Sequence, residues 1–171
     1  MVGLSSFSYL FSELIRHSQS RVTAIGPLEA KLDAAGFQVG ARMVDLISLR
    51  EKSGKREVKL KNVLVLIQTS VFRTLFGKSA DALAQYSSDD AEEYHIVDNE
   101  PLVNRYISVP RDMSDLNCGA FVAGIVKGVL AGAGFPAEVV AHNTPDDDGR
   151  YPYCTTYQVR VTAVDVRARE K

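Results

Sequence analysis

The chain has 171 residues, of which 46% are hydrophobic and 24% charged, and its net charge is -1. This length favours a single domain spanning residues 1–171, and the near-neutral charge argues against nucleic acid as a partner. Two cysteines are too few for a disulfide framework. The N-terminus lacks a basic segment ahead of an apolar one, so no signal peptide is expected. We therefore expect a cytosolic protein that meets membranes only through its surface or a partner.

The first half of the chain has the spacing of amphipathic helices. Apolar residues at helical intervals predict a helix from Leu4 to Ser20. Gly26-Pro27 then interrupts the pattern, and a short helix is expected from Leu28 to Ala35, closed by Gly36 as a left-handed cap. Two more helices with wide apolar faces are predicted from Phe37 to Glu51 and from Leu60 to Phe76, the latter ending at Gly77.

The second half has the patterns of strands and turns. Residues 78–91 show no firm periodicity and are predicted to be a surface loop, with one helical turn around Asp81. Alternation and turn residues predict two hairpins, one over about 93–109 and one over about 137–163. Their strands would be Tyr94–Val97, Val103–Val109, Ala137–His142 and Thr155–Thr162.

A segment between these hairpins, Leu116–Gly134, is apolar or small on every side when wound as a helix. Such a helix, expected over about 115–133, belongs in the middle of a core, and its apolar length is too short to span a membrane. Its small residues, among them Gly119, Ala123 and Gly124, suit either a close helix contact or the wall of an apolar pocket. The predicted fold class is α+β, a four-stranded antiparallel sheet with helices packed on one face.

No pattern for catalysis or metal binding stands out. His17, His95 and His142 are scattered without ligand spacing. The acidic run at 146–148 lacks the ligand spacing of a calcium loop and is predicted to be a solvated turn. Cys118 and Cys154 lack the electropositive neighbours that a nucleophile needs. We expect no enzymatic activity, no cofactor and no metal.

Basic residues crowd the connection between the second pair of helices. This segment is either a solvated junction or a patch that meets anionic lipid headgroups, worth up to about 1 kcal/mol for each cation. Its residues are Arg50, Lys52, Lys55, Arg56, Lys59 and Lys61.

Four predicted helices carry wide apolar faces, of which a small sheet can cover only part, and the N-terminal helix carries the most separable stripe. Packing inside the chain and binding of a partner chain explain it equally well. The stripe consists of Phe7, Leu10, Phe11 and Leu14.

Three motifs resemble the small subunits of the transport protein particle (TRAPP) complex. Leu32–Asp45 is similar to the family signature with its Gly-Phe and Val-Gly pairs, and Asp98–Val103 is similar to the family's hairpin motif. Leu116–Leu130 resembles the branch that contains subunit 5. The similarity extends from about Phe7 to Val161.

This resemblance implies the TRAPP small-subunit α/β plait and a non-catalytic core subunit of a vesicle-tethering complex in ER-to-Golgi transport. The subunit would bridge neighbouring small subunits in an assembly that promotes nucleotide exchange on a Rab GTPase. It would be cytoplasmic and peripheral on ER and cis-Golgi membranes, where direct membrane contact is possible. Dimerisation through N-terminal helices in this family makes Leu10, Phe11, Leu14 and Met43 interface candidates, beside Phe7.

A related subunit carries an acylated cysteine after the second signature helix. The corresponding stretch here, Ser53–Lys59, contains no cysteine, so covalent acylation is not expected. A small-molecule or acyl-chain binding domain with an apolar pocket is the alternative function.

Overall fold

The computed structural model describes residues 3–22, 24–50, 58–87, 91–109, 113, 115–144 and 154–162. The helices before the sheet are α1 (Leu4–Gln19), α2 (Ile25–Arg50), α3 (Leu60–Leu66), a π-helical turn η1 (Ile67–Val71) and α4 (Phe72–Phe76). The remaining elements are β1 (Ala82–Ser87), β2 (Ala91–Asp98), α5 (Leu102–Arg105), α6 (Ala120–Ala133), β3 (Glu138–Asn143) and β4 (Thr155–Thr162).

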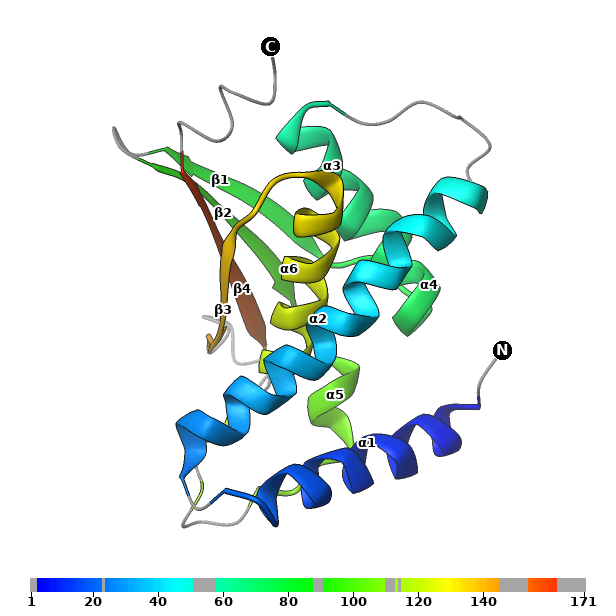
Figure 1. The fold of residues 1–171 in the computed structure, drawn as a ribbon, viewed down its shortest axis with the longest axis vertical. Helices are drawn as coiled ribbons and strands as arrows, with labels where there is room; N and C mark the ends of the chain where they lie inside the picture. The colour runs from blue at the N-terminus through cyan, green and yellow to red at the C-terminus, as the bar shows by residue number, and fades with distance from the viewer. Residues whose placement is uncertain are drawn as a thin grey trace.

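The four strands form one antiparallel sheet in the order β1-β2-β4-β3. Helices cover one of its faces, with α6 against the strands and α2 outside α6 (Figure 1). Burial alternates accordingly along β4, where Tyr157, Val159 and Val161 are buried while Arg160 is exposed. The predicted α+β class, with helices packed on one face of an antiparallel sheet, is confirmed.

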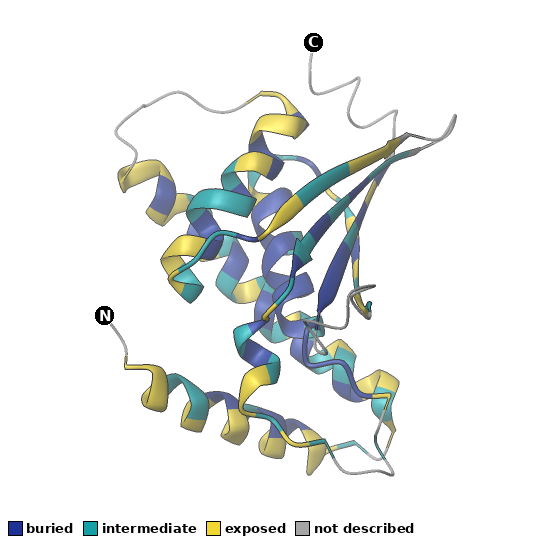
Figure 2. Ribbon diagram, turned by 180° about the vertical axis from the view of Figure 1, so that it is seen from behind, coloured by how far each residue is buried: buried dark blue, intermediate teal, exposed yellow. Residues whose placement is uncertain are grey.

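Helix α6 is the centre of the core. Nine of its residues between Phe121 and Leu130 are buried, and Figure 2 shows the helix in dark blue behind the strands. The predicted core helix is confirmed, but it begins at Ala120 instead of about residue 115. Asn117 causes the later start, because its side-chain Oδ1 accepts a hydrogen bond from the backbone N–H of Gly119 at 2.8 Å and holds a turn there. Gly134, at φ 89°, ends the helix as expected.

Two predicted helices, Leu28–Ala35 and Phe37–Glu51, are a single helix, so the prediction of a break at Gly36 is wrong. Gly36 and Gly40 face α6 so closely that a Cβ on either would collide with the backbone of Phe121 or Ile125. Gly124 of α6 meets the backbone of Asp33 in the same way. The glycines therefore serve a close helix crossing, and the helix continues through them.

The predicted helix over residues 60–76 is confirmed, with one π-helical turn in its middle. The carbonyl of Gln68 in this turn accepts a hydrogen bond from the N–H of Ala80 at 3.0 Å, and the Gln68 side chain donates to the Ala80 carbonyl at 3.3 Å. The π turn thus fixes the chain where it enters β1. Gly77, at φ 79°, ends the helix as predicted.

Two predictions between residues 78 and 109 are wrong. The expected loop contains β1, whose residues have weak strand propensity and which is stabilised by pairing with β2. The expected strand Val103–Val109 is instead the short helix α5, in which Val103 is buried, followed by irregular chain whose Ile107 packs against the core. The first hairpin is therefore β1–β2, while the predicted hairpin of β3 and β4 is confirmed.

Candidate interaction surfaces

Helix α1 lies at one end of the molecule and contacts the rest through one side (Figure 1). Phe11 is 4% exposed, with its ring 5.7 Å from that of Phe7 and 5.3 Å from that of Phe121. Ile15 and Ser18 continue this buried side. The apolar stripe of α1 therefore attaches the helix to the chain's own core.

The structure separates the predicted interface residues by burial. Phe11 and Met43 are buried inside the chain, and Phe7 and Leu14 are half-buried against the same core. Leu10 is 72% exposed, because it lies at the margin of the stripe that faces the core. In the free chain Leu10 is thus the candidate most available to a partner.

Further apolar side chains are exposed on α1 and α2. Leu49, near the C-terminal end of α2, is 79% exposed, and Leu46 shares its side of the helix. Tyr9 is 80% exposed beside Leu10. Figure 2 shows exposed residues along the outer side of α1 and at the end of α2. Leu46 belongs to the wide apolar face that the sequence predicted for this helix, whereas Leu49 was not part of that prediction.

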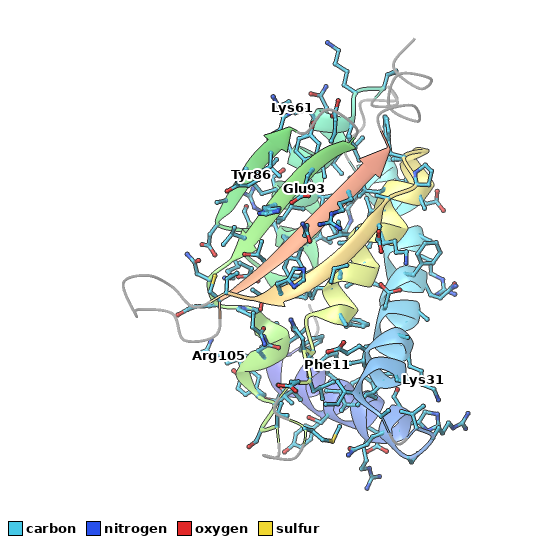
Figure 3. The ribbon with its side chains drawn as sticks, turned by 90° about the vertical axis from the view of Figure 1, so that its left-hand side faces the viewer. Phe11, Lys31, Lys61, Tyr86, Glu93 and Arg105 are labelled. Atoms are coloured by element: carbon cyan, nitrogen blue, oxygen red, sulfur yellow. The ribbon has the colours of Figure 1, made fainter. Side chains whose placement is uncertain are left out.

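Part of the predicted basic patch lies within the described residues. Arg50 ends α2, and Lys59 and Lys61 lie at the start of α3, all three exposed. Lys61 is at the opposite end of the molecule from Phe11 and α1 (Figure 3). The other basic residues of the patch, Lys52, Lys55 and Arg56, lie outside the described residues. No helix in the described ranges is long and apolar enough to cross a membrane.

Gly119 and Gly124, at and within α6, pack closely against described residues of the same chain. Asp33 of α2 occupies the space beside Gly124, and the side chains of Asn117 and Thr155 occupy the space beside Gly119. Ala123 borders an open cleft of about 290 Å³ between α2, α6 and β3. Both glycines therefore allow close packing, and the cleft beside Ala123 is open to the surface.

The outer face of the sheet carries a hydrogen-bonded polar network. Glu93 of β2 accepts hydrogen bonds from Gln158 at 2.6 Å, His95 at 2.7 Å and Arg160 at 3.2 Å. These contacts, led by Gln158 and then His95, lower the pKa of Glu93 to about 2. The Tyr86 ring of β1 lies 4.5 Å from that of His95, and both Tyr86 and Glu93 project from the open face in Figure 3. The network depends on strand register, which sequence spacing alone did not reveal.

Cysteine and metal chemistry find little support in the described part of the chain. Cys118 and Cys154 are both free and buried. Burial, and secondarily the nearby Glu29 carboxylate, raise the pKa of Cys118 to about 11, so its thiol stays protonated at neutral pH. Among the described residues no group of three or more His, Cys, Asp or Glu side chains is placed to hold a metal ion. The predicted acidic turn at 146–148 lies outside the described residues.

Comparisons of the sequence and of the fold with known proteins point to the same family. The model of the transport protein particle (TRAPP) component family matches residues 7–162. Trafficking protein particle complex subunit 5 of Mus musculus is 51% identical over 141 residues, 82% of this chain and 74% of the relative. The subunit 5 of Dictyostelium discoideum is 47% identical over 151 residues, 88% of this chain and 81% of the relative.

The fold has a counterpart among solved structures. A crystal structure of trafficking protein particle complex subunit 3 from Naegleria fowleri, covalently bound to palmitic acid, matches with a TM-score of 0.77. The match covers 93% of this chain and 95% of that one at 18% identity, so it shows a shared fold. Together with the family model and the subunit 5 relatives, it shows that the chain belongs to the family of TRAPP components, which are subunits of a trafficking protein complex.

Proposed function

We propose that this chain is a non-catalytic core subunit of the TRAPP vesicle-tethering complex and bridges neighbouring subunits. The observation that carries the proposal is the exposure of large apolar side chains on two helices, with Leu10 72% and Leu49 79% exposed. Such side chains gain most from water exclusion when another subunit covers them. The relatives named as trafficking protein particle complex subunits support this reading.

A structural role fits the state of the reactive side chains. Cys118 is buried and protonated, His95 is hydrogen-bonded to Glu93, and His142 is hydrogen-bonded to Gln158 at 3.2 Å. Cys118 is thus enclosed in the core, and each of the two histidines is hydrogen-bonded within the chain on the exposed face of the sheet. We infer that the chain supports the activity of its complex by holding other subunits in place.

The assembly proposal is tested by charge placed in the exposed apolar surface. Leu10→Asp and Leu49→Asp should remove co-purification of the neighbouring subunits upon co-expression, with the fold retained because both side chains are exposed. Ser12→Asp is the matched control, since Ser12 is also exposed on α1 but lies about 160° around the helix from Leu10. Unchanged co-purification of both leucine variants, judged beside folded circular dichroism spectra, would contradict the interface assignment.

The proposed role in nucleotide exchange requires the assembled complex. We propose that the other subunits, purified without this chain or after co-expression with the Leu10→Asp variant, release fluorescent nucleotide from their Rab GTPase more slowly than the intact complex does. The isolated chain should have no effect on release. Acceleration by the isolated chain would contradict a non-catalytic role.

Peripheral location on ER and cis-Golgi membranes is proposed to involve the basic patch. Each cation near an anionic surface contributes about 1 kcal/mol, so Lys59→Glu with Lys61→Glu should weaken binding of the complex to phosphatidylserine vesicles. Phosphatidylcholine vesicles provide the neutral control. If the wild-type complex and the variant complex sedimented equally with phosphatidylserine vesicles, the patch would face solvent or another subunit.

Covalent acylation is not part of the proposal. The related subunit 3 is covalently bound to palmitic acid. In this chain both cysteines are buried, with Cys118 2% and Cys154 6% exposed. Intact mass spectrometry of the chain purified from cells should therefore show the unmodified mass, and a mass increase equal to one palmitoyl group would refute this inference.

A further inference from the structure

Strand β3 is one edge of the sheet, and the contacts with β4 show which of its residues bond to that strand and which face outward. The N–H of Thr144 donates to the carbonyl of Cys154 at 3.0 Å, which places the next paired residues of β3 at His142 and Val140. The alternate residues of β3, Val139, Ala141 and Asn143, direct their backbone N–H and C=O groups away from β4. The Asn117 side chain confirms that Ala141 faces outward, because its amide donates a hydrogen bond of 3.1 Å to the Ala141 carbonyl from the side away from β4.

Most of these outward groups have no hydrogen-bond partner within the described residues. Asn117 satisfies the Ala141 carbonyl, which leaves the N–H groups of Val139, Ala141 and Asn143 and two carbonyls. An uncovered row of alternating donors and acceptors is a template for another strand. In Figure 3 β3 is the edge strand beside α6 and α2.

This edge borders the open cleft of about 290 Å³. Ala120 and Ala123 of α6 form the base of the cleft, and the N-terminal half of α2 forms the side opposite β3. Small side chains at the base leave room beside the strand for another extended backbone. The cleft therefore offers backbone hydrogen bonds on one side and apolar contact beneath.

The charge of the cleft selects among possible occupants. Glu29, Asp33 and Glu138 line it, opposed by Lys127, whose Nζ is 3.4 Å from the Asp33 carboxylate. Glu29 accepts a hydrogen bond from the N–H of Asn117 at 2.8 Å, while Glu138 is exposed. A second copy of β3 would bring two sets of these acids together. The net negative charge instead complements a lysine or arginine.

We propose that an extended segment of a neighbouring subunit, carrying a lysine or arginine, adds to the outer edge of β3 as a fifth strand. Its backbone pairs with the outward groups of Val139 and Asn143 and accepts from the Ala141 N–H, while Asn117 keeps the Ala141 carbonyl. Its basic side chain reaches Glu138. The inference rests on the proposed assembly only in requiring that a neighbour is present.

Residue-resolved hydrogen exchange tests this pairing with an internal control. In the free chain the N–H groups of Ala141 and Asn143 should exchange quickly, whereas those of Val140 and His142 are bonded to β4 and exchange slowly. In the purified complex the first pair should slow by about tenfold or more. Slow exchange of Ala141 and Asn143 in the free chain, or unchanged fast exchange in the complex, overturns the inference.

Variants separate this site from the surface of α1 and α2. Ala141→Pro removes an outward donor that β4 does not use, and Glu138→Lys reverses an exposed charge. Both should weaken affinity for the complex at least about fivefold, and Glu138→Lys keeps the test valid if the proline variant misfolds. Glu100→Lys is the control, because Glu100 is also exposed but does not line the cleft. A complex that assembles normally with Glu138→Lys and Ala141→Pro overturns the inference and leaves the role of Leu10 standing.

Discussion

In the Gly40→Ala variant, a methyl group would enter the crossing of α2 and α6. That methyl would lie 2.9 Å from the carbonyl carbon of Ile125 and closer still to its oxygen, whereas real Cβ contacts essentially never fall below 3.0 Å. The atom opposite is backbone, so rotation of a side chain cannot relieve the clash. The helices would have to separate by about 0.5–1 Å, which forfeits a quarter to a half of the dispersion energy along their contact.

Two opposing effects set the expected magnitude. Alanine favours a helix over glycine by about 1 kcal/mol, while overpacking of a tight core costs about 1–3 kcal/mol and occasionally more. Because the clash here is with backbone, we expect the cost to dominate and the variant to lose about 2 kcal/mol net. That loss corresponds to a Tm lower by about 4–8 °C for a chain of this size.

Urea and thermal unfolding of matched variants provide the assay. Gly132→Ala is the matched control, because its added Cβ would lie 2.8 Å from the Val44 side chain, which can shift, and not against backbone. It should be near neutral, since the gain in helix propensity of up to about 1 kcal/mol offsets a small movement of Val44. If Gly40→Ala were as stable as Gly132→Ala, the backbone contact between α2 and α6 would be wrong.

Three further predictions concern buried or networked groups. The Tyr157 hydroxyl is buried without a hydrogen-bond partner in the described structure, so Tyr157→Phe should be neutral or stabilising by about 1 kcal/mol in urea unfolding. A clear loss of stability would indicate a partner for that hydroxyl. Because the pKa of Glu93 falls from 4.5 to about 2 on folding, its ionised form stabilises the fold above pH 4.5 and this contribution is lost as the pH falls toward 2. Glu93→Gln should therefore reduce the dependence of the urea midpoint on pH in that window, and an unchanged dependence would contradict the network. With its pKa raised to about 11, Cys118 should resist iodoacetamide at pH 8 in the native chain and react after unfolding, and rapid native labelling would refute its burial.

The elements that the sequence predicted well are those whose pattern needs no knowledge of their neighbours. Helix α6 is apolar on every side, and β4 alternates between buried and exposed residues, so both patterns indicate their environment directly. Strand β1 carries no such pattern, since Ala-Leu-Ala-Gln-Tyr-Ser has weak strand propensity and depends on pairing with β2. Its prediction required a register that only the folded sheet defines.

Gly36 shows why local signals failed elsewhere. A glycine after a short amphipathic segment is compatible both with a left-handed cap and with a close helix crossing. The distinction depends on Phe121, a distant residue whose backbone meets Gly36. The interface candidates met the same difficulty, because periodicity identified Leu10 and Phe11 together. Only the fold separates Phe11, covered by this chain, from Leu10, which is exposed.

The proposed bridging of two neighbours requires two separate surfaces, and the two proposed surfaces lie in different places. Leu10 lies on α1 at one end of the molecule, whereas Glu138 lies on β3 at an edge of the sheet (Figure 1). If each surface binds a different subunit, Leu10→Asp and Glu138→Lys should each release a different partner from the co-expressed complex. Their effects should then be additive, as expected for distant sites with no shared contact. Loss of the same single partner in both variants would show that one neighbour spans both surfaces, and the chain would then terminate the assembly instead of bridging it.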